Sequence, residues 1–312
     1  MAATTTLPPM FPALLTVLLF AASAVAGERT ARYWGSERGN LIRLAIATAL
    51  MWAVTLAFFP QTVRPVPYGW LFLSGVVGFG LGDICLFLAY VRVGARLAIL
   101  LNLCTAPLWG AGVEWLWLGT AIGPREIAAG AVILAGVALA ILSRDPSAVP
   151  RTGSRWAGVL FALGAGCGQG MGAVISRKAI ETAARLGTDL NGFSAAAQRV
   201  SGGFAATLAV VLVMKALGER AALPAATTTR GRAVGWLLAT TFCGPILGVS
   251  AFQWALSVLP AGIVTAVTAT TPIAMIPLVM AIDREKPRPL SLAGAAVAVG
   301  GVLLLLRMRG QG

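Results

Sequence analysis

Residues 69–96 read GWLFLSGVVGFGLGDICLFLAYVRVGAR, an apolar stretch with a single carboxylate, Asp83. Its opening Gly-Trp-Leu returns as Gly235-Trp236-Leu237, 166 residues later (235 − 69 = 166). A collinear series of matches at one offset rarely arises by chance, even in a chain rich in small residues. Four further positions recur at the same offset: Gly78, Leu81, Gly82 and Ala89 match Gly244, Leu247, Gly248 and Ala255.

The duplication continues downstream with a slightly shorter offset. Pro107 matches Pro272 at 165 residues (272 − 107 = 165), and Gly130 matches Gly294 at 164 (294 − 130 = 164). A slip of this size fits in the turns between helices. Internal repeats define architecture before any local feature does, so the chain is divided into two repeats, 1–148 and 149–312.

Composition indicates the class of protein. The chain has 312 residues, of which 58% are hydrophobic and 11% charged, whereas soluble domains carry about 25% charged residues. Apolar runs of about 18–25 residues recur, each long enough to cross a hydrocarbon core of ~30 Å. Spans in lipid must satisfy their own backbone hydrogen bonds and are therefore helices. The sequence predicts an all-α integral membrane protein.

Ten transmembrane helices are expected, five in each half. An odd number per half makes the second half enter the membrane from the opposite side. The halves are then an inverted-topology repeat, an architecture found in many secondary transporters. The expected spans are 9–27, 41–59, 69–91, 97–118 and 125–142, then 156–176, 193–216, 232–257, 262–282 and 290–307.

The basic residues predict orientation. The net charge of +13 would also fit nucleic-acid binding, but Lys and Arg are spread over short connections between spans, as topology-setting charges are. More of them follow odd-numbered helices, where Arg29, Arg32, Arg38 and Arg43 form the first group. This places odd connections in the cytoplasm and both termini outside, in a multi-pass protein of the plasma (inner) membrane.

Residue usage excludes several chemistries. The chain has no His, so His-based metal sites, His proton relays and Ser/His/Asp catalysis are excluded. The four cysteines have neither metal-ligand spacing nor a disulfide framework. A Walker loop is also absent from the sequence. We expect a protein that is not an enzyme, binds no metal and needs no cofactor.

Asp83 is the leading candidate for a functional charge. A carboxylate at a helix centre costs roughly 2.5–3.5 kcal/mol on insertion scales. Its repeat equivalent is Val249, so the charge is a specialisation of one half. It is interpreted either as a proton, cation or substrate-amine site or as one partner of a structural ion pair. Arg92 and Arg96 are too far along the same helix to pair with it directly.

Other polar residues in the spans are candidates for substrate binding or coupling. Glu114 stands among tryptophans, where an interfacial role is the alternative, and Arg199 either contacts a substrate carboxylate or reaches the interface. The neutral candidates are Asn102, Gln169, Gln253, Trp254 and Thr271. Pro107 and Pro272 are predicted helix breaks, because proline removes a backbone hydrogen bond. Gly78, Gly82, Gly244 and Gly248 are predicted helix-packing positions, since small residues permit close contact in lipid.

The pattern Gly82-Asp83-x-x-x-Phe87-x-Ala89-x-x-x-x-Gly94-Ala95-Arg96, followed by Pro107, resembles the EamA family of the drug/metabolite transporter superfamily. In the second half Pro272, Gly294 and Gly300-Gly301 continue the resemblance. It implies a ten-helix, two-repeat permease that moves small metabolites such as amino acids. It also implies that helices 1, 3 and 4 face helices 6, 8 and 9 around a central cavity.

The resulting functional hypothesis is a secondary transporter of small polar metabolites working by alternating access, with proton coupling left open. The rival is a non-transporting sensor or assembly protein with the same fold. A cavity lined by Asp83, Asn102 and Gln169 favours transport, whereas a dry interface with Asp83 held in a fixed pair favours the rival. Expected partners are a small-molecule substrate, the lipid bilayer and protons, with no nucleic acid. A homodimer is left open.

Overall fold

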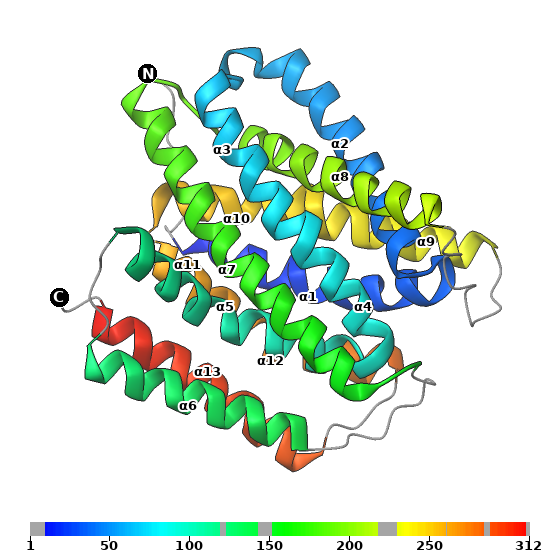
Figure 1. Ribbon diagram of the computed structural model, residues 1–312, viewed down its shortest axis with the longest axis vertical. Coiled ribbons are helices and arrows are strands. Elements are labelled where there is room, and N and C mark those ends of the chain that lie inside the picture. The colour runs from blue at the N-terminus through cyan, green and yellow to red at the C-terminus, as the bar shows by residue number, and fades with distance from the viewer. Residues whose placement is uncertain are drawn as a thin grey trace.

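The computed structural model describes residues 10–118, 123–142, 152–217, 230–259, 261–283 and 288–309. Within these ranges the chain is all-helical and forms ten spans, as the repeat predicted (Figure 1). The first half consists of α1 (Phe11–Trp34), α2 (Ser36–Phe58), the α3–η2–α4 span, α5 (Ala95–Leu118) and α6 (Pro124–Leu142). The second consists of α7 (Arg155–Arg185), α8 (Gly192–Ala216), the α9–η3–α10 span, the α11–α12 span and α13 (Pro289–Arg309).

Eight of the helices in the described residues are long and apolar enough to cross a membrane, and two shorter apolar segments, Ile127–Ala140 and Pro289–Leu304, belong to α6 and α13. The expectation of an integral membrane protein with repeated halves is therefore confirmed. The first connection is much tighter than predicted, because α1 ends at Trp34 and α2 starts at Ser36. Gly35 makes this turn with φ 82°, a conformation that favours glycine.

The third span of each half is interrupted at the same place. In the first half α3 (Pro65–Gly75) passes through the π-helical η2 (Val76–Asp83) into α4 (Ile84–Val93). In the second, α9 (Arg230–Thr241) passes through the π-helical η3 (Phe242–Ile246) into α10 (Leu247–Val258). The two π-segments start 166 residues apart (242 − 76 = 166), which is the sequence offset. Such π-helical insertions are frequent at functional sites.

Equivalent residues of the two halves make matching hydrogen bonds to the opposite half. The hydroxyl of Thr240 donates to the carbonyl oxygen of Ser23 at 3.1 Å, and that of Ser74 donates to the carbonyl oxygen of Gly172 at 2.7 Å. Ser74 and Thr240 are repeat equivalents (240 − 74 = 166), and each bonds the first helix of the opposite half. The final helices α6 and α13 also pair with each other, side by side at the edge of the bundle (Figure 1).

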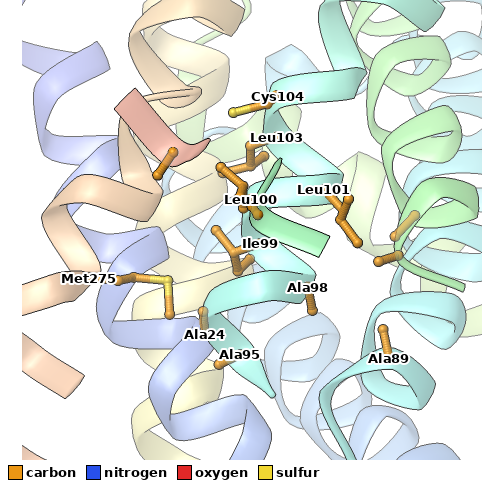
Figure 2. Close-up of a cluster of buried hydrophobic side chains, with 14 of the residues drawn as sticks. Ala24, Ala89, Ala95, Ala98, Ile99, Leu100, Leu101, Leu103, Cys104 and Met275 are labelled. Atoms are coloured by element: carbon orange, nitrogen blue, oxygen red, sulfur yellow. The ribbon is translucent and has the colours of Figure 1, made fainter. Parts of the chain in front are cut away.

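The largest apolar cluster surrounds α5 (Figure 2). Leu100, Leu101 and Leu103 project from successive positions around this helix, so α5 is packed on several sides at once. Met275 of α12 (Thr271–Asp283) belongs to the same cluster and is fully buried. The Cys104 thiol donates to the carbonyl oxygen of Ala269 at 3.7 Å. These two residues are 165 apart (269 − 104 = 165), so this hydrogen bond joins repeat-equivalent residues of the two halves.

Glycines allow the halves to approach to backbone contact. A Cβ built on Gly75 would lie 1.7 Å from the carbonyl oxygen of Arg199, and one on Gly202 would lie 2.0 Å from that of Phe72. A Cβ on Gly168 of α7 would lie 2.8 Å from the Cα of Gly82. The third span of the first half is thereby pressed against both α7 and α8 of the second half. Small residues at helix contacts are the usual means of close packing in lipid.

Candidate functional site

A cavity lies between the two halves and is lined by both interrupted helices. It encloses about 550 Å³ of empty space, counting the space at its opening. Both halves contribute to its wall, which consists of Phe20, Ser23, Ala24, Arg43, Phe79, Asp83, Leu86, Tyr90, Ile99, Asn102, Leu103, Gln169, Arg199, Gly244, Pro245 and Val249.

Asp83 lines this cavity from the end of η2 and is paired with Arg43. The Nη2 of Arg43 donates both to the Asp83 carboxylate and to the Oδ1 of Asn40, the latter at 2.9 Å. The Arg43 Cζ also lies 4.8 Å from the centroid of the Phe87 ring. The ion pair offsets much of the cost of placing a carboxylate inside the membrane.

The assignment of Arg43 to a connection was wrong. It lies inside α2, seven residues after Ser36 (43 − 36 = 7), and is buried. The predicted span started at residue 41, so Arg43 stood only two residues inside it and was counted with Arg38 in one basic connection, whereas α2 starts at Ser36. The two arginines considered as partners for Asp83 are elsewhere. Arg92 donates to the Leu88 carbonyl, and Arg96 donates to the Ser291 hydroxyl.

Arg199 lines the same cavity from α8 and is only 2% exposed. Its Cζ lies 5.2 Å from the centroid of the Phe79 ring and 5.8 Å from that of Phe252. Its Nε is buried and makes no hydrogen bond within the described part of the chain. Of the two uses considered for Arg199, the geometry therefore favours the cavity over the membrane interface.

The two arginines occupy equivalent places. Arg199 stands seven residues after Gly192, the first residue of α8 (199 − 192 = 7), just as Arg43 stands in α2. Each guanidinium packs against a glycine of the opposite half. A Cβ on Gly78 would lie 2.6 Å from the Nη2 of Arg199, and a Cβ on Gly244 would lie 3.1 Å from the Nη1 of Arg43. Gly78 and Gly244 are themselves repeat equivalents.

Asn102 and Gln169 complete the polar part of the wall. Asn102 comes from α5 and is 5% exposed, and its Oδ1 is a buried acceptor with no partner among the described residues. Gln169 comes from the glycine-rich middle of α7 and is half-buried. The sequence proposed Asp83, Asn102 and Gln169 as the lining of a cavity, and the structure brings all three to one.

Three other candidates lie away from the cavity. Gln253 is buried and its Nε2 donates to the Ser176 hydroxyl at 3.0 Å, which links α10 to α7. Trp254 packs edge-on against Phe11, with ring centroids 6.2 Å apart. The Thr271 hydroxyl donates to the Thr268 carbonyl at 2.6 Å, at the start of α12. The side chain of Glu114 lies outside the described residues.

The two prolines differ in their effect on the backbone. Pro107 lies inside α5, which continues through it. Pro272 follows a real interruption, because α11 (Ala261–Thr268) ends and α12 begins at Thr271. Gly248 is tightly enclosed, with the Cys243 carbonyl oxygen 2.4 Å from a built Cβ, whereas Gly82 has 3.5 Å to its nearest neighbours.

Comparison with known families agrees with this architecture. The model of the EamA-like transporter family matches residues 7–142 and again residues 156–307. The two matches cover nearly the whole chain. The chain belongs to the EamA-like transporter family. The resemblance identified from the sequence is thus confirmed, and this is a family of transporters, not of enzymes.

Solved structures share the fold of this EamA-like transporter. A crystal structure matches with a TM-score of 0.64 and 17% sequence identity, covering 97% of this chain and 99% of that one. At this identity the likeness establishes the fold alone. No curated protein matches the chain significantly.

The wall of the cavity differs from the expected arrangement in two respects. The α1, η2–α4, α5, α7 and η3–α10 segments contribute as expected, but α2 and α8, the second helices of the halves, supply the two arginines. Among the described residues, α11 and α12 contribute nothing to the lining. The described residues also contain no group of three or more potential metal ligands among His, Cys, Asp and Glu.

Proposed function

We propose that this EamA-like transporter moves small polar metabolites, such as amino acids, by alternating access, with the cavity between the halves as its substrate site. The observation that carries the proposal is the joint lining of that cavity by ionisable and amide groups of both repeats. Inverted repeats place their substrate near the bilayer midplane at the repeat interface. Rocking of one half against the other would expose the site to either side in turn.

Asp83 is proposed as the coupling group. It is the carboxylate among the described cavity residues, and it holds Arg43 through an ion pair. Protonation would remove the negative charge of Asp83 and break its ion pair with Arg43. A proton gradient would in this way change the charge and the contacts of the site. With odd connections in the cytoplasm, as the basic residues predict, both termini of the chain would lie outside.

The rival is a non-transporting sensor or assembly protein. The Arg43–Asp83 pair alone fits it, since a fixed pair can be purely structural. The polar cavity beside that pair favours transport, because a static assembly protein gains nothing from buried polar atoms that have no hydrogen-bond partner among the described residues.

The test is an uptake screen in proteoliposomes. Pools of radiolabelled amino acids and other small metabolites are offered with and without a pH gradient to the wild type, D83N and E181Q. Glu181 is the matched control, because it is a half-exposed carboxylate in an ion pair with Arg177, outside the cavity. Gradient-dependent uptake that D83N loses and E181Q keeps supports both parts of the proposal. Uptake that D83N retains in full removes the coupling role, and no flux of any pool from folded protein favours the rival.

A further inference from the structure

The cationic groups of the cavity are duplicated by the repeat, but its acceptor groups are not. Arg43 and Arg199 stand at equivalent places in α2 and α8. Asp83, by contrast, is matched by Val249 in the other half (249 − 83 = 166). Arg43 therefore has a carboxylate in its own half, whereas the equivalent position in the half of Arg199 is a valine.

The two amides follow the same rule. Asn102 is matched by Val267 at the offset of the paired prolines (267 − 102 = 165). Gln169 is matched by Phe20 at the offset that joins Ser23 to Gly172 (169 − 20 = 149 and 172 − 23 = 149). Asp83, Asn102 and Gln169 are thus each matched by an apolar residue at the equivalent position of the other half.

Among the described residues, the site has two guanidinium groups and one carboxylate. The Nη2 of Arg43 donates hydrogen bonds to Asp83 and Asn40. The guanidinium of Arg199 instead lies over two phenyl rings, and its buried Nε makes no hydrogen bond among the described residues. Cation–π contacts recover only a part of the free energy that desolvating an ion costs. An anion is the partner that would complete this arrangement.

The geometry around Arg199 suits a planar anion. Glycines make room for the guanidinium itself, since a Cβ on Gly78 or Gly172 would lie 2.6 or 2.9 Å from its Nη2. An anion would therefore approach Arg199 from the cavity that this residue lines. A guanidinium presents a fork of donors that matches a carboxylate through two parallel hydrogen bonds. The rest of the wall includes Phe20, Phe79 and Leu103, which suits an organic ligand with an apolar part.

Resting on the proposed transport function, we infer that its substrate, among small metabolites, is an organic monocarboxylate with an apolar body rather than an amino acid, and that Arg199 binds the carboxylate. One negative charge makes the occupied site neutral. A zwitterionic amino acid supplies no net charge, and the carboxylate that would receive its ammonium is already paired with Arg43. The Oδ1 of Asn102 is left to accept from a hydroxyl or an amide of the substrate.

A binding series on the full-length protein in nanodiscs tests this inference. The probes share one carbon skeleton and differ in charge: 4-methylpentanoate, its neutral amide, leucine and leucinamide. We expect 4-methylpentanoate to bind at least 10-fold more tightly than leucine, and the amide and leucinamide to bind more weakly still. Tighter binding of leucine, the amide or leucinamide than of the acid overturns the inference.

Two variants address the arginine and its missing partner. R199Q should weaken carboxylate binding about 10- to 100-fold, the factor expected for loss of one hydrogen-bonded charge. V249D should do the same with Arg199 still in place, because it supplies the carboxylate that the other half already has. R125Q is the matched control, since Arg125 is exposed at the start of α6. Normal carboxylate binding by folded R199Q or V249D overturns the role of Arg199.

Failure of this inference is distinguishable from failure of the transport proposal. If wild-type protein takes up a pool in proteoliposomes but binds no carboxylate of the series, the substrate class is wrong and transport stands. If neither uptake nor binding occurs in protein that melts cooperatively, both fail. The R199K variant separates charge from geometry: it should bind the carboxylate with intermediate affinity, because lysine keeps the charge and loses the fork.

Discussion

Arg43 and Arg199 hold equivalent positions in the second helices of the two repeats, 156 residues apart (199 − 43 = 156). Each reaches across the interface to a glycine of the other half, Gly244 and Gly78 respectively. Only Arg43 has a carboxylate partner in the described part of the cavity. Because of this departure from symmetry, the described lining residues carry one more positive than negative charge. This excess is the reason why we expect the site to bind an anion.

Removing one member of the Arg43–Asp83 ion pair should destabilise the protein more than removing both members. Replacing Arg43 by Met leaves a buried carboxylate alone, and we expect a loss of about 3–5 kcal/mol. The double variant R43M/D83L should recover most of that loss, since neither charge remains to be desolvated. Thermal unfolding in detergent, measured by fluorescence-detection size-exclusion chromatography after heating, compares the variants. Equal destabilisation of the single and double variants would show that the pair itself contributes little.

Gly78 should matter through the room it leaves for Arg199. In G78A the new methyl group would meet the Nη2 of Arg199 at 2.6 Å and displace the guanidinium. We expect uptake to fall about 10-fold with a change in stability below about 1 kcal/mol, because the end of a long side chain can move. G69A is the control from the same span, since a Cβ there meets nothing within 4 Å. Equal uptake by the two variants would argue against this role.

The contact between α3 and α8 should be intolerant of a methyl group. A Cβ on Gly202 would lie 2.0 Å from the carbonyl oxygen of Phe72, which is backbone and cannot rotate away. G202A should therefore destabilise the protein by about 1–3 kcal/mol or more, as overpacking does. G231A serves as the control, because nothing lies within 4 Å of a Cβ at Gly231. Thermal melting in detergent measures both, and a melting temperature unchanged in G202A would contradict the packing described.

The seam between α1 and α9 should have to open during transport. The hydroxyls of Ser23 and Thr240 lie 3.2 Å apart across the two halves. A disulfide in S23C/T240C, with the native cysteines replaced by alanine, should stop uptake reversibly, since alternating access requires the halves to move. Reduction should restore activity, and the single S23C variant should be indifferent to oxidant. Full uptake by the cross-linked protein would rule out movement at this seam.

The sequence was sufficient for the fold because the fold depends on long-range periodicity. Apolar runs fixed the spans, and the recurrence of Gly69-Trp70-Leu71 fixed the repeat. The π-segments at Val76 and Phe242 fall at the same offset, so the repeat extends to local backbone irregularities. Hydropathy cannot reveal these, because a π-helical segment and an α-helical one have the same composition.

The site was predicted only in part. Asp83, Asn102 and Gln169 stood out as polar groups in apolar spans, whereas Arg43 was concealed by its nearness to Arg38 and the short turn at Gly35. Aligning the second helices of the halves would have revealed it, since Arg43 then coincides with Arg199. Gln253 and Trp254 were chosen on residue type, but the face of a helix that meets the cavity depends on packing that one sequence does not encode locally.

Uptake by R199Q beside R125Q is the most direct test that substrate crosses through the cavity between the halves. Both variants lose one arginine, the first inside the cavity and the second from the exposed start of α6. With folded protein matched in proteoliposomes, the pool that the wild type accumulates should enter R199Q vesicles at least 10-fold more slowly and R125Q vesicles at the normal rate. Equal rates in the two would contradict the central claim, because the cavity would then not be the path of the substrate.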